Sequence, residues 1–389
     1  MNALLDDRAV AARVLAHVEN RSTDLGETVW REPVENYRSE ARLQAEMALL
    51  RRLSVPFCPA AALDEEGAFV ARPAAGVPIV AVRGRDGQVR AFRNACRHRG
   101  MPVADGRGCT KTFVCRYHGW GYGLDGALRH VPHEEGFPGL DKDSHGLVPV
   151  RAEERSGLVF VTQDGAEASP ADLPPILAPG QMLFDSAERE VAANWKIFAE
   201  SFLEGYHIRP THRESFYPYG FDNLNVIEAF GRNSRVTFPF RRIAKLAEVP
   251  EAERRIDGLL TYVYHLFPNV LVAVLSRHTM VVVLEPLSAG RTRMVTYGLT
   301  NPPAEGEDAD PERLRTEAAR DAAFADIGGQ EDRDVTCAIQ RGLASEANDH
   351  FTFGRFEGAI VHFHRVLDAA LGEVAVSTAA GRTQAREAE

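Results

Sequence analysis

Two short pairs of Cys and His constrain this chain more than any other feature of its sequence. Cys96-x-His98 and Cys115-x-x-His118 are separated by sixteen residues within CRHRGMPVADGRGCTKTFVCRYH, and a Gly-Trp-Gly-Tyr run follows the second pair. Each pair offers one thiol and one imidazole, which are side chains that bind zinc and iron–sulfur clusters. The fold must therefore bring two loops together around one metal group.

This ligand set is that of a Rieske [2Fe–2S] centre, in which two His replace two Cys on one of the two irons. Neutral imidazoles add less negative charge than thiolates would, which raises the reduction potential to roughly −150 to +300 mV. A structural zinc ion is the alternative, because it also takes two Cys and two His. Zinc fingers usually pair Cys with Cys and His with His, whereas each pair here is mixed, so the sequence favours the cluster.

Length and composition indicate a protein of two or three domains. The 389 residues carry a net charge of −10, which argues against a nucleic-acid partner. No apolar run reaches the ~18 residues that a membrane helix needs. The chain begins with acids where a secretion signal has bases, so we predict a cytoplasmic location without membrane attachment. Cys58, Cys109 and Cys337 are predicted to be buried free thiols, and Cys109, between the two ligand pairs, is a candidate to contact the cluster.

The first half of the chain divides into segments with different patterns of apolar residues. Apolar residues recur at helical spacing over 3–20 and 40–53, which predicts an N-terminal helical segment over residues 1–52 that packs on the second unit. From about residue 70, short β-rich runs follow one another, with two Asp-Gly hairpin turns. We predict a small all-β domain over residues 53–165 that carries both Cys/His pairs on its turns.

A second unit is predicted over residues 166–389. A stretch rich in Pro, Ala and Gly at 165–180 indicates a linker. Five β-rich runs then lie between residues 236 and 300. Helical patterns follow them at 312–326, 331–343 and 355–371. Several antiparallel strands followed by helices indicate an α+β layer fold.

The segment NWKIFAESFLEGYHIRPTH carries a second set of candidate metal ligands. Glu200, Glu204 and His207 are spaced four and three residues apart, which predicts that one helical face holds all three. Pro210 is expected to end that helix, so that His212 turns back toward the same point. Two imidazoles and one carboxylate with open positions form the facial triad of non-haem Fe(II) oxygenases. Taken singly, each side chain also fits a plainer role, as a core histidine or a solvated helix acid.

Together the two motifs carry a family resemblance. The chain resembles the terminal oxygenase (α) subunits of the Rieske non-haem iron oxygenases, which hydroxylate aromatic rings or quaternary amines, over about residues 40–370. The resemblance implies a helix-grip-like catalytic domain, an antiparallel sheet with helices, in addition to the Rieske domain. It also implies two metal groups, a [2Fe–2S] cluster on the Cys/His pairs and a mononuclear Fe(II) ion. In the family pattern acid-x-x-His-x4-His, which matches Glu204, His207 and His212, the acid is not an iron ligand.

The resemblance assigns the third iron ligand to an Asp late in the chain. Asp332, within GGQEDRDV, is the best match, and the two glycines are expected to release the chain so that a new helix begins there. An ordinary first-turn acid beside the helix dipole is the alternative, and Glu331 and Asp334 compete for the ligand role. We predict that His207, His212 and Asp332 bind the iron.

Glu200 is predicted to be mainly an acid on the helix surface, with support of a ligand as the alternative. Glu204 stands where many members of the family carry Asp. Members that act on quaternary ammonium compounds often have Glu there, so Glu204 favours such a substrate.

The resemblance also implies the reaction. Electrons from NAD(P)H pass through a separate reductase, directly or through a ferredoxin, to the cluster and then to the iron, where O₂ serves to dioxygenate, monooxygenate or demethylate a small organic substrate. The chain has no GxGxxG motif opening a βαβ unit and no plant-type ferredoxin cysteine run, so the reductase is expected to be a partner protein.

A Rieske-type electron-transfer protein without its own oxygenase activity is the alternative, but that role leaves the three predicted iron ligands unexplained. The resemblance further implies a head-to-tail homotrimer, in which a carboxylate bridges a Rieske His of one chain to an iron-ligand His of the next. Glu204 is the expected bridge and hence a catalytic residue, and His98 or His118 of the neighbour is its expected partner.

Overall fold

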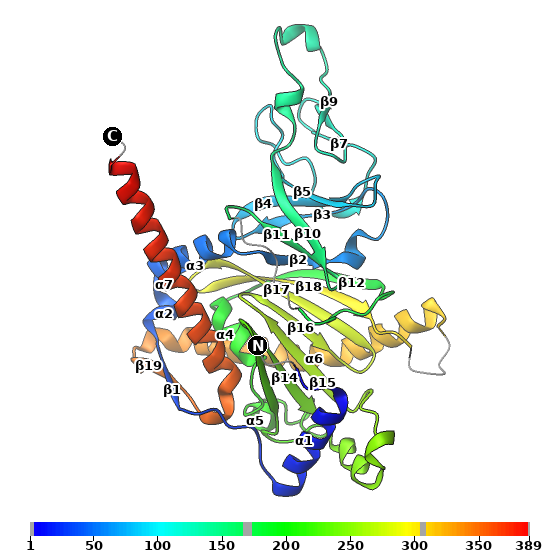
Figure 1. Ribbon diagram of the computed structural model, residues 1–389, viewed down its shortest axis with the longest axis vertical. Coiled ribbons are helices and arrows are strands. Elements are labelled where there is room, and N and C mark those ends of the chain that lie inside the picture. The colour runs from blue at the N-terminus through cyan, green and yellow to red at the C-terminus, as the bar shows by residue number, and fades with distance from the viewer. Residues whose placement is uncertain (1–3, 166–172, 304–308, 388–389) are drawn as a thin grey trace. The chain divides into compact units, whose positions relative to one another are not determined.

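The computed structural model of the chain describes residues 4–165, 173–303 and 309–387 (Figure 1). The chain forms two compact units, one of residues 50–183 and one that joins residues 1–49 to residues 184–389. The predicted domain limits at 52/53 and 165/166 stay predictions, and residues 166–172 of the predicted linker lie outside the described residues. In the part of the chain that the structure describes, no helix combines the length and apolar character needed to cross a membrane.

The unit of residues 50–183 is built from antiparallel β-structure. Its larger sheet has seven strands in the order β2-β11-β10-β5-β4-β3-β6, and a smaller sheet has three in the order β7-β8-β9. Both predicted Asp-Gly hairpin turns are confirmed, between β4 and β5 and between β8 and β9. The strands are β2 Val55–Pro59, β3 Ala68–Ala74, β4 Val77–Arg83, β5 Val89–Arg93, β6 Gly106–Cys109, β7 Phe113–Val114, β8 Gly121–Tyr122, β9 Leu128–His130, β10 Pro149–Arg155 and β11 Leu158–Thr162.

The core of this unit reaches up to the two Cys/His pairs. Val80 and Val82, on one face of β4, are buried in the same apolar cluster as Cys96 and Cys115. The two thiols therefore belong to the hydrophobic core. By contrast, Cys109 is exposed, so its predicted burial is wrong, because all four residues of the short edge strand β6 lie at the surface.

The other unit is an α+β layer structure, as predicted. Its sheet has seven strands in the order β12-β18-β17-β16-β15-β14-β13, and β1 pairs with β19. The five predicted β-rich runs correspond to β14 to β18. The strands are β1 Trp30–Pro33, β12 Leu183–Val191, β13 Val226–Phe230, β14 Asn233–Pro239, β15 Leu260–Leu266, β16 Val270–Val274, β17 His278–Ser288, β18 Arg291–Thr300 and β19 His350–Phe353. The helices of the chain are α1 Asp7–Asn20, α2 Glu35–Arg38, α3 Glu40–Arg52, α4 Trp195–Ser201, α5 Ile208–Thr211, α6 Pro311–Gly342 and α7 Gly358–Glu387.

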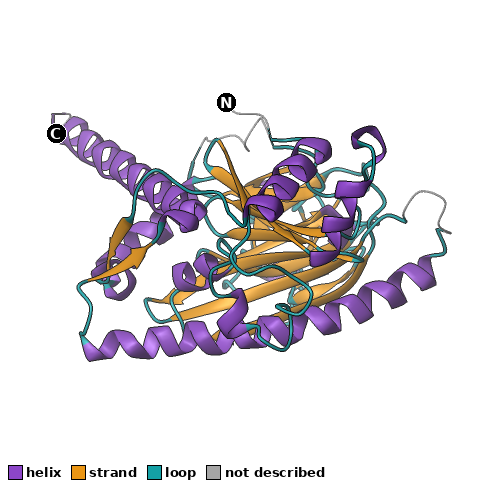
Figure 2. Cartoon of the chain, turned by 90° about the horizontal axis from the view of Figure 1, so that it is seen from below, coloured by secondary structure: helices purple, strands orange, loops and turns teal. Residues whose placement is uncertain are grey.

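The long helix α6 runs along the seven-stranded sheet of this unit (Figure 2) and contacts α4, β17 and β18. The predicted break at Gly328 and Gly329 is wrong, because α6 continues through both. Gly328 is buried, and a Cβ atom there would lie 2.2 Å from the ring of Phe216. The glycine lets an aromatic ring approach the helix backbone, and the hydrogen bonds of the helix on either side keep it intact.

Substitutions at the two glycines separate close packing from helix propensity. We expect Gly328→Ala to lower the free energy of unfolding by about 1–3 kcal/mol, because the added methyl group overlaps Phe216. Gly329→Ala is the matched control, since the atoms near its Cβ position are the flexible side-chain ends of Arg333 and Asp326; it should be neutral or raise that free energy by up to about 1 kcal/mol. Denaturant unfolding of the three proteins measures both. Equal stability of the two variants would contradict the packing role of Gly328.

Candidate metal centres

The two Cys/His pairs lie on two loops that each contain the same type of backbone turn. In the first loop the N–H of Gly100 donates to the carbonyl of Cys96 at 2.8 Å, and in the second the N–H of Gly119 donates to the carbonyl of Cys115 at 2.9 Å. Both glycines have a positive φ, +79° and +75°, which residues with a Cβ atom rarely adopt. Repetition of the turn places one thiol at the start of each loop and one imidazole near its tip.

The thiols and the imidazoles of these loops have different environments. Cys96 and Cys115 are each 3% exposed, whereas His98 is partly exposed and His118 is exposed. The two imidazole rings are neighbours, with centroids 4.7 Å apart. A Rieske cluster has two thiolates on one iron and two imidazoles on the other. A buried sulfur pair and a more exposed nitrogen pair fit that division.

The spacing of the four side chains disfavours a single zinc ion. Four ligands at about 2.0–2.3 Å from one tetrahedral Zn²⁺ would lie within about 4 Å of one another. Among the described residues, the one group of three or more potential ligands whose atoms all lie within 4.8 Å of one another is elsewhere, at His207, His212 and Asp332. The Cys/His set is wider, as a two-iron cluster requires.

Tyr122 and Trp120, which the sequence analysis did not single out, contact the ligands of the cluster site. The Tyr122 hydroxyl lies 3.2 Å from Cys96 Sγ, and the Trp120 ring stacks on His98 with a centroid distance of 5.0 Å. Burial, together with the contact to Cys96, raises the pKa of Tyr122, so its O–H stays a hydrogen-bond donor. Hydrogen bonds to the sulfurs tune the reduction potential of such clusters. Both residues belong to the Gly-Trp-Gly-Tyr run, which was the available signal.

The second centre brings together three residues that the sequence predicted as ligands. His212 Nε2 lies 3.1 Å and His207 Nε2 3.5 Å from Asp332 Oδ1. His212 is 1% and Asp332 9% exposed. The segment around α5 supplies both imidazoles, and the middle of α6 supplies the carboxylate, although Asp332 was expected in the first turn of a new helix.

The backbone reaches this arrangement by a turn rather than by the predicted helix. Helix α4 ends before Glu204, so the single helical face expected for Glu200, Glu204 and His207 does not exist. Glu204 accepts the N–H of His207 at 3.2 Å, in place of a helical carbonyl. His207 and His212 flank the single turn of α5, and Pro210 lies inside α5 instead of ending a longer helix. A proline in the first turn of a helix loses no hydrogen bond.

Each imidazole of this centre also contacts a second carboxylate through its other ring nitrogen. Nδ1 of His207 hydrogen-bonds to Glu204. Nδ1 of His212 lies 2.7 Å from Glu331 Oε2, which also accepts the hydroxyl of Ser215 at 2.5 Å. A carboxylate on Nδ1 fixes the tautomer, orients the ring and makes the free nitrogen more basic. Glu331, treated above as a competing ligand, is therefore the partner of His212.

The electrostatics of the centre fit a divalent cation. Burial lowers the pKa of His207, but hydrogen bonds from its ring to Asp332 and Glu204 outweigh burial and raise that pKa to about 10. Burial raises the pKa of Asp332, but its hydrogen bonds to both imidazoles outweigh burial, so the net shift is downward. The carboxylates of Asp332, Glu204 and Glu331 thus surround two imidazoles. Two His and one carboxylate with open positions are the ligand set of non-haem Fe(II) oxygenases.

Two other acids considered above lie outside the centre. Glu200 is only 7% exposed, accepts the hydroxyl of Tyr37 at 2.7 Å and lies 2.8 Å from His364 Nε2. The predicted surface position of Glu200 is wrong, because the N-terminal segment and α7 pack over it. Asp334 is exposed and accepts the side-chain amide of Gln330.

Comparisons with known proteins cover both units. Residues 54–142 match the Rieske [2Fe-2S] domain, and residues 183–373 match the catalytic domain of the ring hydroxylating alpha subunit. The carnitine monooxygenase oxygenase subunit of Escherichia coli is 38% identical over 157 residues, which cover 37% of this chain and 41% of that protein. The glycine betaine monooxygenase oxygenase subunit of Chromohalobacter salexigens is 29% identical over 74% of this chain and 73% of its own length. The alignments with the carnitine monooxygenase subunits span about two fifths to one half of their length.

Solved structures share the fold. A quaternary ammonium Rieske monooxygenase in complex with L-carnitine has a TM-score of 0.69 at 21% identity, over 95% of this chain and 99% of that one. Naphthalene 1,2-dioxygenase from Rhodococcus sp. bound to indole has a TM-score of 0.73 at 19% identity, over 95% of this chain and 100% of that one. With a Rieske domain and a ring-hydroxylating catalytic domain in one polypeptide, the chain belongs to the Rieske non-haem iron oxygenases, as a terminal oxygenase α subunit.

Proposed function

We propose that the protein is the terminal oxygenase component of a multicomponent Rieske oxygenase. In this proposal it uses O₂, and electrons from a separate NAD(P)H-dependent reductase, to hydroxylate or demethylate a small organic substrate. The observation that carries the proposal is the convergence of His207, His212 and Asp332 in a chain that also has a Rieske domain. A pure electron carrier would have no use for that triad. In this proposal electrons reach the cluster from the reductase directly or through a ferredoxin.

Cys96, His98, Cys115 and His118 are the proposed cluster ligands. His207, His212 and Asp332 are the proposed ligands of the mononuclear iron. When bound, ferrous iron offers open coordination positions for O₂, and the cluster delivers single electrons.

The remaining residues of the centre hold the proposed ligands in place. Glu204 and Glu331 each hydrogen-bond to Nδ1 of one imidazole, and the Nε2 atoms of both rings face Asp332. Phe216 packs against His212 with a ring-centroid distance of 4.8 Å and covers one side of its ring. Water is thereby excluded from that side of the centre.

Quaternary ammonium compounds are the substrate class that we favour. Relatives that carry names of this class include carnitine monooxygenase subunits, glycine betaine monooxygenase and the choline monooxygenase of Spinacia oleracea. Glu204, in place of the Asp that many family members carry, points the same way. An arene is the second candidate, because the biphenyl 2,3-dioxygenase subunit alpha of Rhodococcus jostii is 36% identical over 168 residues. A role in aromatic hydrocarbon catabolism and a cytoplasmic location stay predictions.

A head-to-tail homotrimer is the proposed assembly, with Glu204 as the bridge between neighbouring chains. Support comes from the contact of Glu204 with His207 and from Tyr206, two residues further on, which is 57% exposed although Glu204 itself is 8% exposed. In this arrangement Glu204 would also hydrogen-bond to His98 or His118 of the neighbouring chain.

Metal content and oxygen uptake test the proposed function directly. We expect about three irons and two acid-labile sulfides per chain. With reductase supplied, O₂ uptake should depend on substrate across a panel of quaternary amines and arenes. His118→Ala should lose the sulfide, whereas His207→Ala should keep the Rieske absorption but lose turnover. One zinc per chain without sulfide would exclude the cluster, and substantial turnover by His207→Ala would exclude the triad.

Neighbouring acids on α6 provide a graded test of the mononuclear site. We expect Asp332→Ala to lose mononuclear iron while the cluster stays. Glu331→Gln should retain the site but bind Fe(II) about 10–100-fold more weakly, because His212 loses its carboxylate partner. Asp334→Ala is the control and should bind iron normally, since Asp334 is exposed. Titration of Fe(II) into cluster-loaded apoprotein measures all three. Loss of iron in Asp334→Ala with retention in Asp332→Ala would move the ligand by two residues.

Electron transfer between chains is the property that Glu204 should control. Because Glu204 also holds His207, Fe(II) is supplied in excess so that the mononuclear site stays filled. Glu204→Gln is then expected to keep both metals and three chains per particle, yet slow oxidation of the pre-reduced cluster by about 10–100-fold or more. Glu214→Gln, an exposed acid two residues beyond His212, is the control and should react at the normal rate. Single-turnover absorption with substrate and O₂ measures the rate, and sedimentation measures the assembly. A fully active monomer would exclude the proposed role of Glu204 as a bridge between chains.

A further inference from the structure

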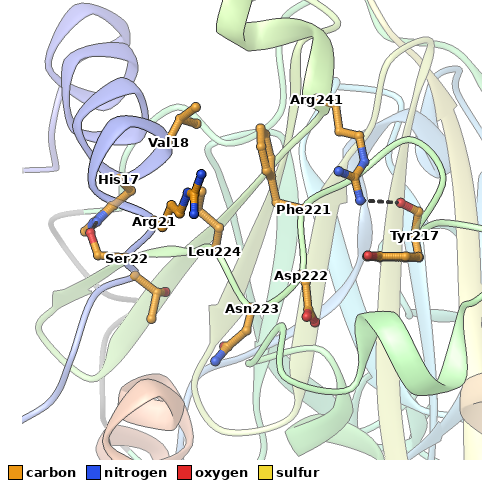
Figure 3. Close-up of a pocket in the computed structure, with 11 residues that line it drawn as sticks. His17, Val18, Arg21, Ser22, Tyr217, Phe221, Asp222, Asn223, Leu224 and Arg241 are labelled. Carbon is orange, nitrogen blue, oxygen red and sulfur yellow. Dashed lines mark hydrogen bonds between the residues drawn. The ribbon is translucent and has the colours of Figure 1, made fainter.

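A cavity of about 510 Å³ lies apart from the proposed metal ligands, on the unit that carries α6 (Figure 3). One wall is the C-terminal end of α1, with Val18 and Arg21. The other is the segment 217–224 together with Arg241. Helix α1 is fixed there by apolar packing, because Val10 and Val14 are fully buried against residues of β13 and the following turns. Packing within the unit therefore holds α1 beside the segment 217–224.

Two arginines approach this cavity from opposite walls. Arg21 projects from the end of α1 toward the middle of the cavity, and Arg241 faces it from the side of Tyr217 (Figure 3). Arg241 donates a hydrogen bond to the carbonyl of Tyr217 at 3.2 Å. Among the ion pairs of the described residues, neither guanidinium has a carboxylate partner. Two cations that face one cavity without a counter-charge favour an anion between them.

The acids near the cavity are already matched by other cations. Asp222, in its wall, lies 3.5 Å from Arg209 Nη1. Asp24, beside His17, lies 2.8 Å from Arg13 Nη2. The positive charge of Arg21 and Arg241 is therefore the part of the lining that remains unbalanced.

The backbone conformation of Arg21 also supports a role for this residue in the cavity. Arg21 caps α1 in the left-handed region, with φ and ψ both 49°, a position where glycine or asparagine is usual. A side chain with a Cβ atom is strained in this conformation. The strained residue is the one whose guanidinium lies toward the cavity (Figure 3).

The rest of the lining is apolar or aromatic. Val18 and Leu224 line one side, and the guanidinium of Arg241 lies 4.9 Å from the Tyr217 ring centroid and 5.7 Å from that of Phe221. An inorganic anion would satisfy the charges but leave this apolar surface uncovered. A carboxylate attached to a compact apolar body covers both.

We propose that this cavity binds a small organic monocarboxylate between Arg21 and Arg241. The site is an accessory one, because the segment that forms its wall is hydrogen-bonded to the backbone of the metal centre. The N–H of Tyr217 donates to the carbonyl of His212 at 2.9 Å, and the N–H of Asn223 donates to the carbonyl of Gly205 at 3.2 Å. An occupant therefore holds the segment that follows the second iron-ligand candidate.

Calorimetric titration of the full-length, cluster-loaded protein with benzoate tests this proposal. Arg21→Gln and Arg241→Gln should each weaken binding by about tenfold or more, because each removes a charged hydrogen-bond donor. Arg8→Gln on α1 and Arg242→Gln next to Arg241 are matched controls outside the cavity lining and should bind normally. Benzamide, which lacks the charge, should bind much more weakly. Hydrogen exchange of residues 217–224 should slow when benzoate is present.

Binding at the metal centre is distinguished by Asp332→Ala, which should keep the affinity for benzoate. The proposal is overturned if benzoate does not bind, if the Arg21 and Arg241 variants bind it normally, or if affinity is lost only with Asp332→Ala. Tighter binding of inorganic phosphate than of benzoate would overturn the ligand class. None of these readouts depends on turnover, so failure of the accessory site and failure of the proposed oxygenase reaction are separate results.

Discussion

The mononuclear centre depends on one type of contact that occurs twice. In each case a carboxylate holds an imidazole through its Nδ1 atom. The carboxylates come from different elements, Glu204 from the turn after α4 and Glu331 from the middle of α6. Because the two rings are held from outside, both Nε2 atoms face Asp332, which lies one residue after Glu331 on α6. Metal-binding geometry therefore depends on where α6 lies against the segment of residues 207–212. Gly328 sets that distance by admitting the ring of Phe216 against the helix.

Buried charges hold α4, which precedes this segment. Lys196 and Glu46 form an ion pair at 2.8 Å with both side chains 1% exposed, and the indole N–H of Trp195 donates to the same carboxylate. Removal of water from two charges is costly, and breaking such a pair costs about 3–5 kcal/mol because one charge is left uncompensated. Glu200, with Tyr37 and His364 around it, forms a second polar contact of this kind. These contacts explain why the N-terminal residues fold as part of the larger unit.

The two metal centres are constructed in opposite ways. The cluster ligands lie within a span of twenty-three residues. Their two loops have the same type of turn, with a glycine at positive φ in each loop. The mononuclear ligands are separated by more than a hundred residues, between His212 and Asp332. Local turns fix the first centre, whereas the second exists only once α6 has packed on its sheet.

Because one centre is local and the other depends on distant contacts, the sequence by itself determined different amounts of each. The Cys/His pairs, the His-x4-His spacing and the antiparallel strands of the larger sheet follow from short-range patterns, because turns and strands are read within a few residues. Asp332 was identified only through a family pattern, not through any local signal. The role of Glu331, the burial of Glu200 and the passage of α6 through Gly328 were decided by the tertiary structure. Each depends on a contact between segments more than a hundred residues apart, and no local period or spacing encodes which distant side chain will fill the space beside a given residue.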